Sequence, residues 1–114
     1  MGGTLIRDLQ REHRLWLDHN FPNQKAHQPL LGLVEEVGEL AHAHLKFEQG
    51  IREGTESLQD MLALKADAVG DIFIYLMSYC NSSHMDLQGC VEMAWANVKQ
   101  RDWIKDPQGG SIDT

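Results

Sequence analysis

The stretch Pro29–Glu48 reads PLLGLVEEVGELAHAHLKFE, and it sets the fold class of the whole chain. Its apolar residues recur three and four positions apart, which is the spacing of one face of an α-helix. These residues are Leu30, Leu33, Val34, Val37, Leu40, Ala41 and Leu45. Gly50 follows as a helix stop. The stretch therefore predicts one long amphipathic helix over residues 29–48.

Two more helices are expected on either side of this one. The segment 5–19 carries apolar residues near helical spacing. They are Leu5, Leu9, Leu15 and Trp16. A third helix is expected over residues 58–81, after a polar loop at 50–57. The centre of this helix, residues 72–77, is apolar on every side. A helix that is apolar all round is typical of a buried position, so we expect this helix at the centre of the fold.

A fourth helix is expected from Asp86, which suits the N-cap position, to Trp103. The tail from about residue 106 is rich in Pro and Gly and is expected to be flexible. No alternating strand pattern competes anywhere in the chain. The sequence thus predicts a single all-α domain of four helices over residues 1–114. Its broad apolar faces suggest self-association.

Composition and charge limit the function classes that fit the chain. Its 114 residues carry 10 basic and 17 acidic side chains, for a formal net charge of −7. A nucleic-acid-binding protein is expected to show the opposite balance or a strong basic patch, so we expect no nucleic-acid partner. An anionic small molecule would need a bound cation to attract it.

The lack of a recognisable targeting signal and the small number of cysteines favour a cytoplasmic location. No basic start followed by an apolar run marks a signal peptide, and no apolar run approaches the roughly 20 residues of a membrane span. Cys80 and Cys90 are the only cysteines, and they are expected as reduced, buried residues. We therefore expect a cytoplasmic protein with no membrane partner.

Two segments carry carboxylates in the same pattern. Residues 35–39 read EEVGE and residues 67–71 read DAVGD. Residues three or four apart lie on one helical face, so the acids at the two ends of each segment point together. Asp71 directly precedes the apolar run 72–77, where an unpaired carboxylate is very costly to bury. A cation or several hydrogen-bond donors must therefore accompany it.

A divalent metal explains this pattern better than a solvated surface does. Like charges one helical turn apart repel by about a few tenths of a kcal/mol, and Mg²⁺ prefers the oxygen ligands that these acids offer. Gly38 and Gly70 each cost about 1 kcal/mol in a helix interior relative to Ala, and they suggest that the two helices approach closely there. A solvated face usually explains one such motif, but the second acidic pair favours a metal site.

These motifs resemble the MazG-like, all-α nucleoside triphosphate pyrophosphohydrolase superfamily. That family carries Glu-Glu-x-x-Glu on one helix and Glu-x-x-Asp on another. Residues 33–40 (LVEEVGEL) match the first motif completely, and residues 70–76 (GDIFIYL) resemble the second. The segment 97–101 resembles the family's C-terminal basic element. The resemblance covers about residues 30–103.

The resemblance implies a Mg²⁺ site, with Mn²⁺ as an alternative ion. The expected ligands are Glu36, Glu39 and Asp71. Ala68 stands where the family usually has Glu, and Asp67 is expected to take over as a fourth ligand from one residue earlier. Glu35 is expected to bind a second ion or to orient the attacking water. Either Glu35 or Asp67 would then be the general base.

The resemblance also implies a four-helix bundle that is completed as a homodimer or homotetramer. The implied activity is Mg²⁺-dependent hydrolysis of (deoxy)nucleoside triphosphates to monophosphate and pyrophosphate, in nucleotide-pool housecleaning. Lys99 and Arg101 are candidates to clamp phosphate oxygens, although basic residues also suit a helix C-terminus. Trp16 is a candidate for stacking on the base, and core packing is the competing and favoured interpretation.

Three other interpretations compete with this one. A zinc site is disfavoured because His42 and His44 lie on different helix faces and have no His or Cys partner at site spacing. A di-iron bundle needs Glu-x-x-His twice, and the chain has only Glu39-x-x-His42. A helical interaction or regulatory module that has lost catalysis stays open, and Ala68 is the residue that favours it.

Overall fold

The chain forms four helices in a computed structural model that describes residues 5–49 and 58–108. The helices are α1 (Leu5–Asn20), α2 (His27–Gln49), α3 (Leu58–Ser82) and α4 (Leu87–Val98). Those two ranges contain no strand, so the all-α class is confirmed. None of their helices is long and apolar enough to cross a membrane. The predicted loop 50–57 and the tail after residue 108 lie outside the described residues.

The fourth helix is shorter than the sequence predicted. It begins after Asp86, as expected, but it ends at Val98 and does not reach Trp103. The side-chain Oδ1 of Asp102 accepts hydrogen bonds from the backbone N–H groups of Ile104 at 3.1 Å and Lys105 at 2.9 Å. An aspartate that bonds to the backbone just after itself offers the chain a turn in place of a helix. Helical bonding is lost before this turn, because the N–H groups of Gln100 and Arg101 donate to the carbonyls three residues earlier, at 3.2 and 3.0 Å. The predicted end of the helix at Trp103 was therefore wrong.

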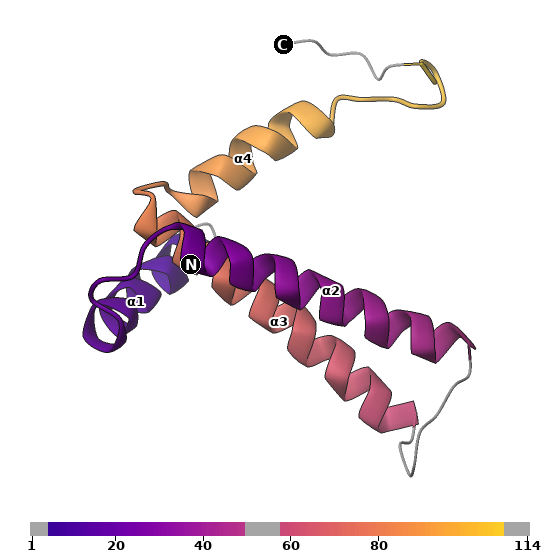
Figure 1. Ribbon diagram of the computed structural model, residues 1–114. Coiled ribbons are helices and arrows are strands. Elements are labelled where there is room, and N and C mark those ends of the chain that lie inside the picture. The colour runs from indigo at the N-terminus through magenta and orange to yellow at the C-terminus, as the bar shows by residue number, and fades with distance from the viewer. Residues whose placement is uncertain (1–4, 50–57, 109–114) are drawn as a thin grey trace.

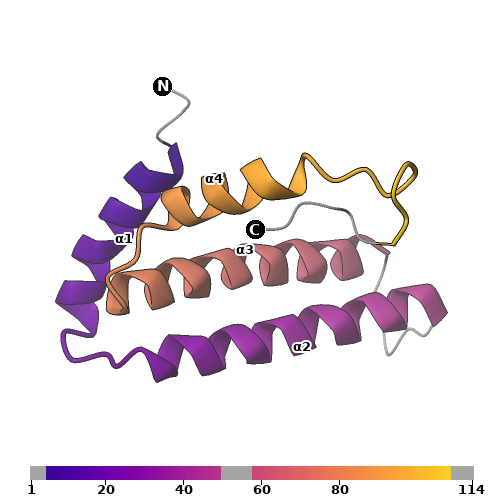
Figure 2. The same cartoon turned by 90° about the horizontal axis from the view of Figure 1, so that it is seen from above.

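The helices make an open arrangement. Helices α2 and α3 pair antiparallel along most of their length, and α1 lies across the end where α2 begins and α3 finishes (Figures 1 and 2). Helix α4 packs against α1 and then diverges from the α2–α3 hairpin (Figure 1). The radius of gyration is 17.8 Å, against about 13 Å for a compact domain of about 100 residues.

A glycine sets the close approach of α2 to α3. A Cβ added at Gly32 would lie 2.8 Å from both Cδ1 and Cζ of Tyr75, so the tyrosine ring occupies the space above the glycine. The sequence had placed the close approach at Gly38 and Gly70, and that prediction was wrong. Within the described ranges nothing lies within 4 Å of a Cβ built at either position.

The small core lies where α1, α3 and α4 meet. Met77, Cys80 and Leu87 are buried together, and partly buried apolar side chains pack around them. Those side chains are Ile6, Phe73, Leu76 and Tyr79. Of the two cysteines that the sequence predicted to be buried, Cys90 is exposed.

A buried glutamine holds the turn between α3 and α4. The Gln10 side chain donates to Oδ1 of Asn81 at 3.0 Å and to the carbonyl of Met85 at 2.8 Å. Its Oε1 accepts from the backbone N–H of Leu87 at 2.9 Å. The Asn81 side chain returns a bond to the Gln10 carbonyl at 3.2 Å. One side chain of α1 thus satisfies polar groups on both sides of the turn, which buried groups require.

An ion pair reinforces the same junction. The Arg7 guanidinium donates from Nε and Nη2 to the two carboxylate oxygens of Asp86, at 3.2 and 2.5 Å. This hydrogen-bonded pairing lowers the pKa of Asp86. Arg14 donates to the backbone carbonyl of Asn81 at 2.6 Å. Helix α1 is therefore fastened to the end of α3 and to the start of α4 by polar contacts on a half-exposed edge.

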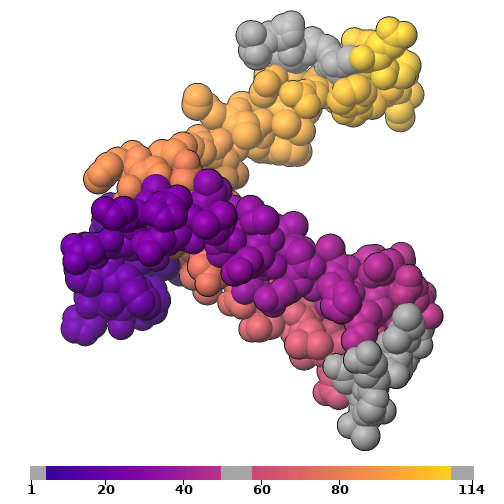
Figure 3. Space-filling model, in the orientation of Figure 1, coloured from indigo at the N-terminus to yellow at the C-terminus, as the bar shows by residue number. Residues whose placement is uncertain are grey.

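Many residues of the apolar stripes on α1 and α2 are exposed in the single chain. The α1 stripe is exposed rather than buried, with Leu15 at 72%. The centre of α3, residues 72–77, was expected to be buried. Met77 is buried and four of these residues are partly buried, whereas Ile74 is 47% exposed. Figure 3 shows α4 standing clear of the hairpin on the face in view. One copy of the chain therefore leaves much of its apolar surface uncovered.

We predict opposite effects of alanine at two glycines of α2. Gly32→Ala should lower the melting temperature, because overpacking against Tyr75 costs about 1–3 kcal/mol and the gain in helix propensity of about 1 kcal/mol offsets only part of it. Gly38→Ala should be neutral or stabilising, since its Cβ meets no described atom. Thermal unfolding followed by circular dichroism would measure both. A Gly32→Ala variant at least as stable as Gly38→Ala would contradict the tight contact.

Candidate functional site

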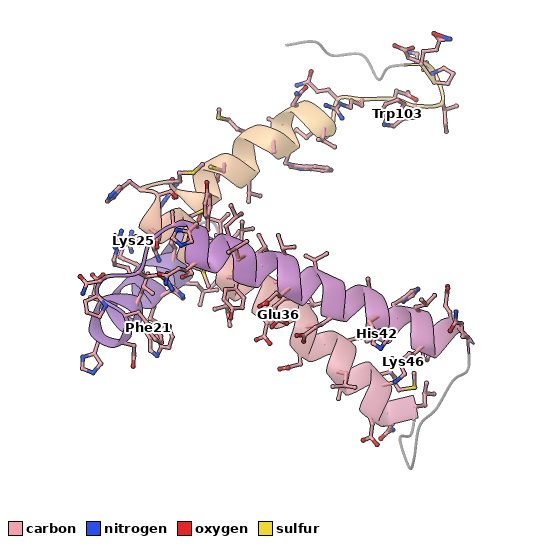
Figure 4. All side chains as sticks on the ribbon, viewed as in Figure 1. Phe21, Lys25, Glu36, His42, Lys46 and Trp103 are labelled. Atoms are coloured by element: carbon pink, nitrogen blue, oxygen red, sulfur yellow. The ribbon has the colours of Figure 1, made fainter. Side chains whose placement is uncertain are left out.

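The hairpin of α2 and α3 brings the two acidic segments to the same level. Counting outward from the contact of Gly32 with Tyr75, in opposite directions along the antiparallel helices, places Glu36 opposite Asp71. Figure 4 shows Glu36 over the seam between the two helices. Acids that lie far apart in the sequence therefore meet because of the helix register.

The charge around Glu36 confirms that these acids are near one another. Partial burial raises the pKa of the Glu36 carboxyl, and four neighbouring carboxylates raise it further. In order of decreasing effect, these neighbours are Glu39, Asp71, Asp67 and Glu35. Two of them come from α2 and two from α3. Glu36 is thus the half-buried centre of a group of five acids.

Within residues 5–49 and 58–108, no three of these side chains stand together as a formed metal-binding group. Carboxylates without a counter-ion repel one another and spread apart. The residues nevertheless fit a divalent cation, because an excess of oxygen donors surrounds a partly desolvated carboxylate. Such an ion would offset the repulsion that raises the Glu36 pKa.

A pocket of about 570 Å³ runs along the hairpin beside these acids. A volume of this size lies in the range of small-molecule sites. From α2 the pocket is lined by Glu35, Gly38, Glu39, His42, Ala43 and Lys46. From α3 it is lined by Met61, Leu64, Asp67 and Ala68. Three of the five acids therefore face a cavity that could hold a ligand.

Ala68 is one of the residues that line this pocket. It is buried, and the helix register places it opposite Glu39. Asp67, its neighbour in sequence, lines the pocket with Glu35 and Glu39. The carboxylate that the second motif lacks at position 68 is thus available from the adjacent residue.

The basic and aromatic candidates do not reach the acids within one chain. Lys99 and Arg101 follow the end of α4, which diverges from the hairpin (Figure 1). Trp16 lies on α1, where its ring is 5.8 Å from that of Phe21 in an edge-on contact. It is about half exposed, so the predicted core packing of Trp16 was wrong for the single chain. None of the three lines the pocket.

Sequence reasoning missed the cationic part of the pocket. His42 is exposed, and it lines the cavity together with Lys46. The signal was present in the spacing, since Glu35, Glu39, His42 and Lys46 follow one helical face at intervals of three and four. His44, two residues from His42, instead approaches Glu48, with Nε2 and Oε2 3.3 Å apart.

The chain matches no protein-family model, no curated protein and no solved structure. Its resemblance to the MazG-like superfamily therefore rests on the two acidic motifs and the basic segment 97–101. The roles assigned to the motif residues stay predictions.

We predict that Glu36→Gln stabilises the metal-free protein. At neutral pH a neutral amide removes the unfavourable interaction with four carboxylates, so the melting temperature should rise. As the pH falls through the raised pKa of Glu36, the wild-type side chain becomes neutral too, and the difference should shrink. Differential scanning calorimetry across this pH range would test both statements.

Glu12→Gln provides the matched control for that variant. Glu12 is exposed on α1, and its substitution should leave the melting temperature nearly unchanged. If Glu36→Gln melts at or below the wild-type temperature at neutral pH, the crowding of charge around Glu36 is not a stability cost.

Proposed function

We propose that this chain is a Mg²⁺-dependent nucleoside triphosphate pyrophosphohydrolase of the MazG-like, all-α superfamily. The observation that supports this most strongly is the half-buried Glu36 among four other carboxylates from two helices. A scaffold has no use for such a group, because it destabilises the folded chain. A cation that binds there turns the repulsion into binding energy.

The overall charge favours a metal-bridged substrate. A protein of net charge −7 with an acidic pocket repels a free polyphosphate, whereas a cation held between the two anions attracts both. In the proposal Glu36, Glu39 and Asp71 hold Mg²⁺, and Asp67 adds a fourth carboxylate. Mg²⁺ usually takes only one or two protein carboxylates, so four carboxylates would suit more than one ion.

In the proposed reaction, water attacks the α-phosphorus in line with the bond to the leaving pyrophosphate. Bound Mg²⁺ supplies charge neutralisation and a lowered pKa of the attacking water. Glu35 or Asp67, which both line the pocket, accepts the proton that the water loses. The new P–O bond forms as the bridging α–β P–O bond breaks, which yields a nucleoside monophosphate and pyrophosphate. Positioning and charge stabilisation carry most of the catalysis in such transfers.

We propose further that the working form is a homodimer or homotetramer. One chain exposes 8283 Å², against about 6300 Å² for a compact monomer of its mass. The excess is larger than the roughly 800 Å² that each partner buries in a standard interface. The face of α4 that starts at buried Leu87 continues at helical spacing through exposed Val91, Trp95 and Val98. A second copy that covers this face completes the four-helix bundle.

A helical interaction module without catalysis is the second candidate. The observation that favours it is Ala68, which occupies the buried position opposite Glu39 without a carboxylate. Such a module would bind its partner through the exposed apolar faces. It should show no saturable stabilisation by Mg²⁺ or Mn²⁺.

We predict that Glu39→Gln lowers pyrophosphate release by at least a hundredfold, because the amide removes a negatively charged metal ligand while its size is unchanged. The assay is a panel of nucleoside triphosphates with Mg²⁺, in which pyrophosphate and orthophosphate are scored separately. Glu48→Gln, on the same helix outside the pocket, should keep its activity. Undiminished activity of Glu39→Gln rules out this site, and orthophosphate as the first product replaces the reaction with a phosphatase.

We predict that Trp95→Glu dissociates the oligomer. Trp95 is 58% exposed in the single chain, and a carboxylate in its place would be buried unpaired at the interface. Light scattering after size-exclusion chromatography should show the wild-type protein as a multiple of 12.9 kDa and the variant at lower mass. Gln100→Glu, beyond the end of α4, is the control. A wild-type monomer at micromolar concentration would contradict the proposed assembly.

A further inference from the structure

The pocket has chemically different ends. Glu35, Glu39 and Asp67 form an acidic end, and His42 and Lys46 form an end with hydrogen-bond donors. Figure 4 shows His42 and Lys46 further along α2 than Glu36, toward the end of the hairpin where α2 finishes and α3 begins. The acidic end belongs to the proposed metal site. The other end has no role in the mechanism above.

The length of the pocket fits one nucleotide. The rise from Glu39 to Lys46 along the α2 axis is about 10 Å. This distance is comparable to the reach from the α-phosphorus of a nucleotide, across its sugar, to the far edge of its base. A triphosphate held at the acidic end would therefore place its base beside His42 and Lys46.

The walls between the two ends suit the flat faces of a base. Ala43 lies on the α2 side, and Leu64 and buried Met61 lie on the α3 side. Apolar side chains pack against the faces of aromatic rings and leave the polar ring edge to be bonded elsewhere. A phosphate would gain nothing from these walls, so a base is the better occupant.

The donors at this end distinguish between base edges. A lysine ammonium such as that of Lys46 can donate hydrogen bonds but cannot accept them, and a His42 ring nitrogen can add a further donor. Guanine, uracil and thymine present carbonyl oxygens on the edge away from the sugar, whereas adenine and cytosine present an amino group there. An amino group facing Lys46 would set donor against donor.

We infer that His42 and Lys46 bind the base of the substrate and select carbonyl-bearing bases over amino-bearing ones. This inference rests on the proposed function for the identity of the ligand. Lys46 is the main determinant because it cannot accept a hydrogen bond. Guanosine and uridine or thymidine triphosphates are thus preferred to those of adenosine and cytidine.

The test compares binding and hydrolysis separately. Binding is measured by calorimetry with Mg²⁺ and α,β-methylene analogues of GTP and ATP, which resist cleavage at the bond in question. Hydrolysis of GTP and ATP is followed in parallel by pyrophosphate release. The wild-type protein should bind the GTP analogue at least about fivefold more tightly, as expected for one specific contact to a base edge.

Lys46→Met removes the donors but keeps a side chain of similar length, so it should reduce this ratio to near one. Lys65→Met is the matched control. Lys65 stands over the Phe47 ring, 4.6 Å from its centroid, and does not line the pocket. His42→Asn should lower the ratio, whereas His44→Asn should not. The two control variants should keep the wild-type ratio.

The outcomes separate this inference from the proposed function. A binding preference that Lys46→Met abolishes supports the inference even if no triphosphate is hydrolysed, a result that would overturn only the enzyme assignment. Equal wild-type binding of both analogues, or an unchanged preference in Lys46→Met, overturns the inference and leaves hydrolysis intact. If neither analogue binds in the presence of Mg²⁺, both are wrong.

Discussion

The contact between Gly32 and Tyr75 is the constraint on which the rest of the structure depends. Two long antiparallel helices can slide past one another, and each shift by one helical turn is about 5.4 Å. The tyrosine ring over the glycine selects one position. That position puts Glu36 opposite Asp71 and lets the pocket form beside them. A larger residue at position 32 would displace the acids of one helix from those of the other.

The crowded carboxylates around Glu36 lower the stability of the folded chain. Partial burial raises the pKa of Glu36, and carboxylates on two helices raise it further, so the folded chain carries an electrostatic penalty at neutral pH. In the proposal, small, hard cations relieve this penalty. Within residues 5–49 and 58–108, the apolar core that could offset this cost is small. Ligand binding and subunit contacts, in the proposal, supply what the core does not.

The helices were predictable because helical periodicity is local. The apolar stripe of residues 29–48 and the apolar run in 58–81 gave the bounds of α2 and α3 to within two residues. The meeting of the two acidic segments was also predictable, because each lies at a similar place on its helix. The end of α4 was not, since no apolar pattern marks the change to i→i−3 hydrogen bonds at Gln100 and Arg101.

Tertiary features were harder to predict. Nothing in the local pattern marks Gly32 rather than Gly38 as the point of close approach, because that depends on which residue of α3 stands opposite. The cavity near Lys46 exists only in this helix register. Burial of Gln10 could not be predicted either, since a glutamine on an amphipathic helix usually faces water. The metal ligands, the reaction and the assembly stay proposals.

The three side-chain bonds of Gln10 have a consequence for how α4 can move. Both ends of the α3–α4 turn depend on one side chain from a third helix, and a buried group that loses its bond costs about 1–3 kcal/mol. A small rotation of α4 would strain these bonds together rather than one by one. We therefore expect the contacts of α4 with α1 to break in one cooperative step. Helix α4 should not occupy a range of intermediate angles.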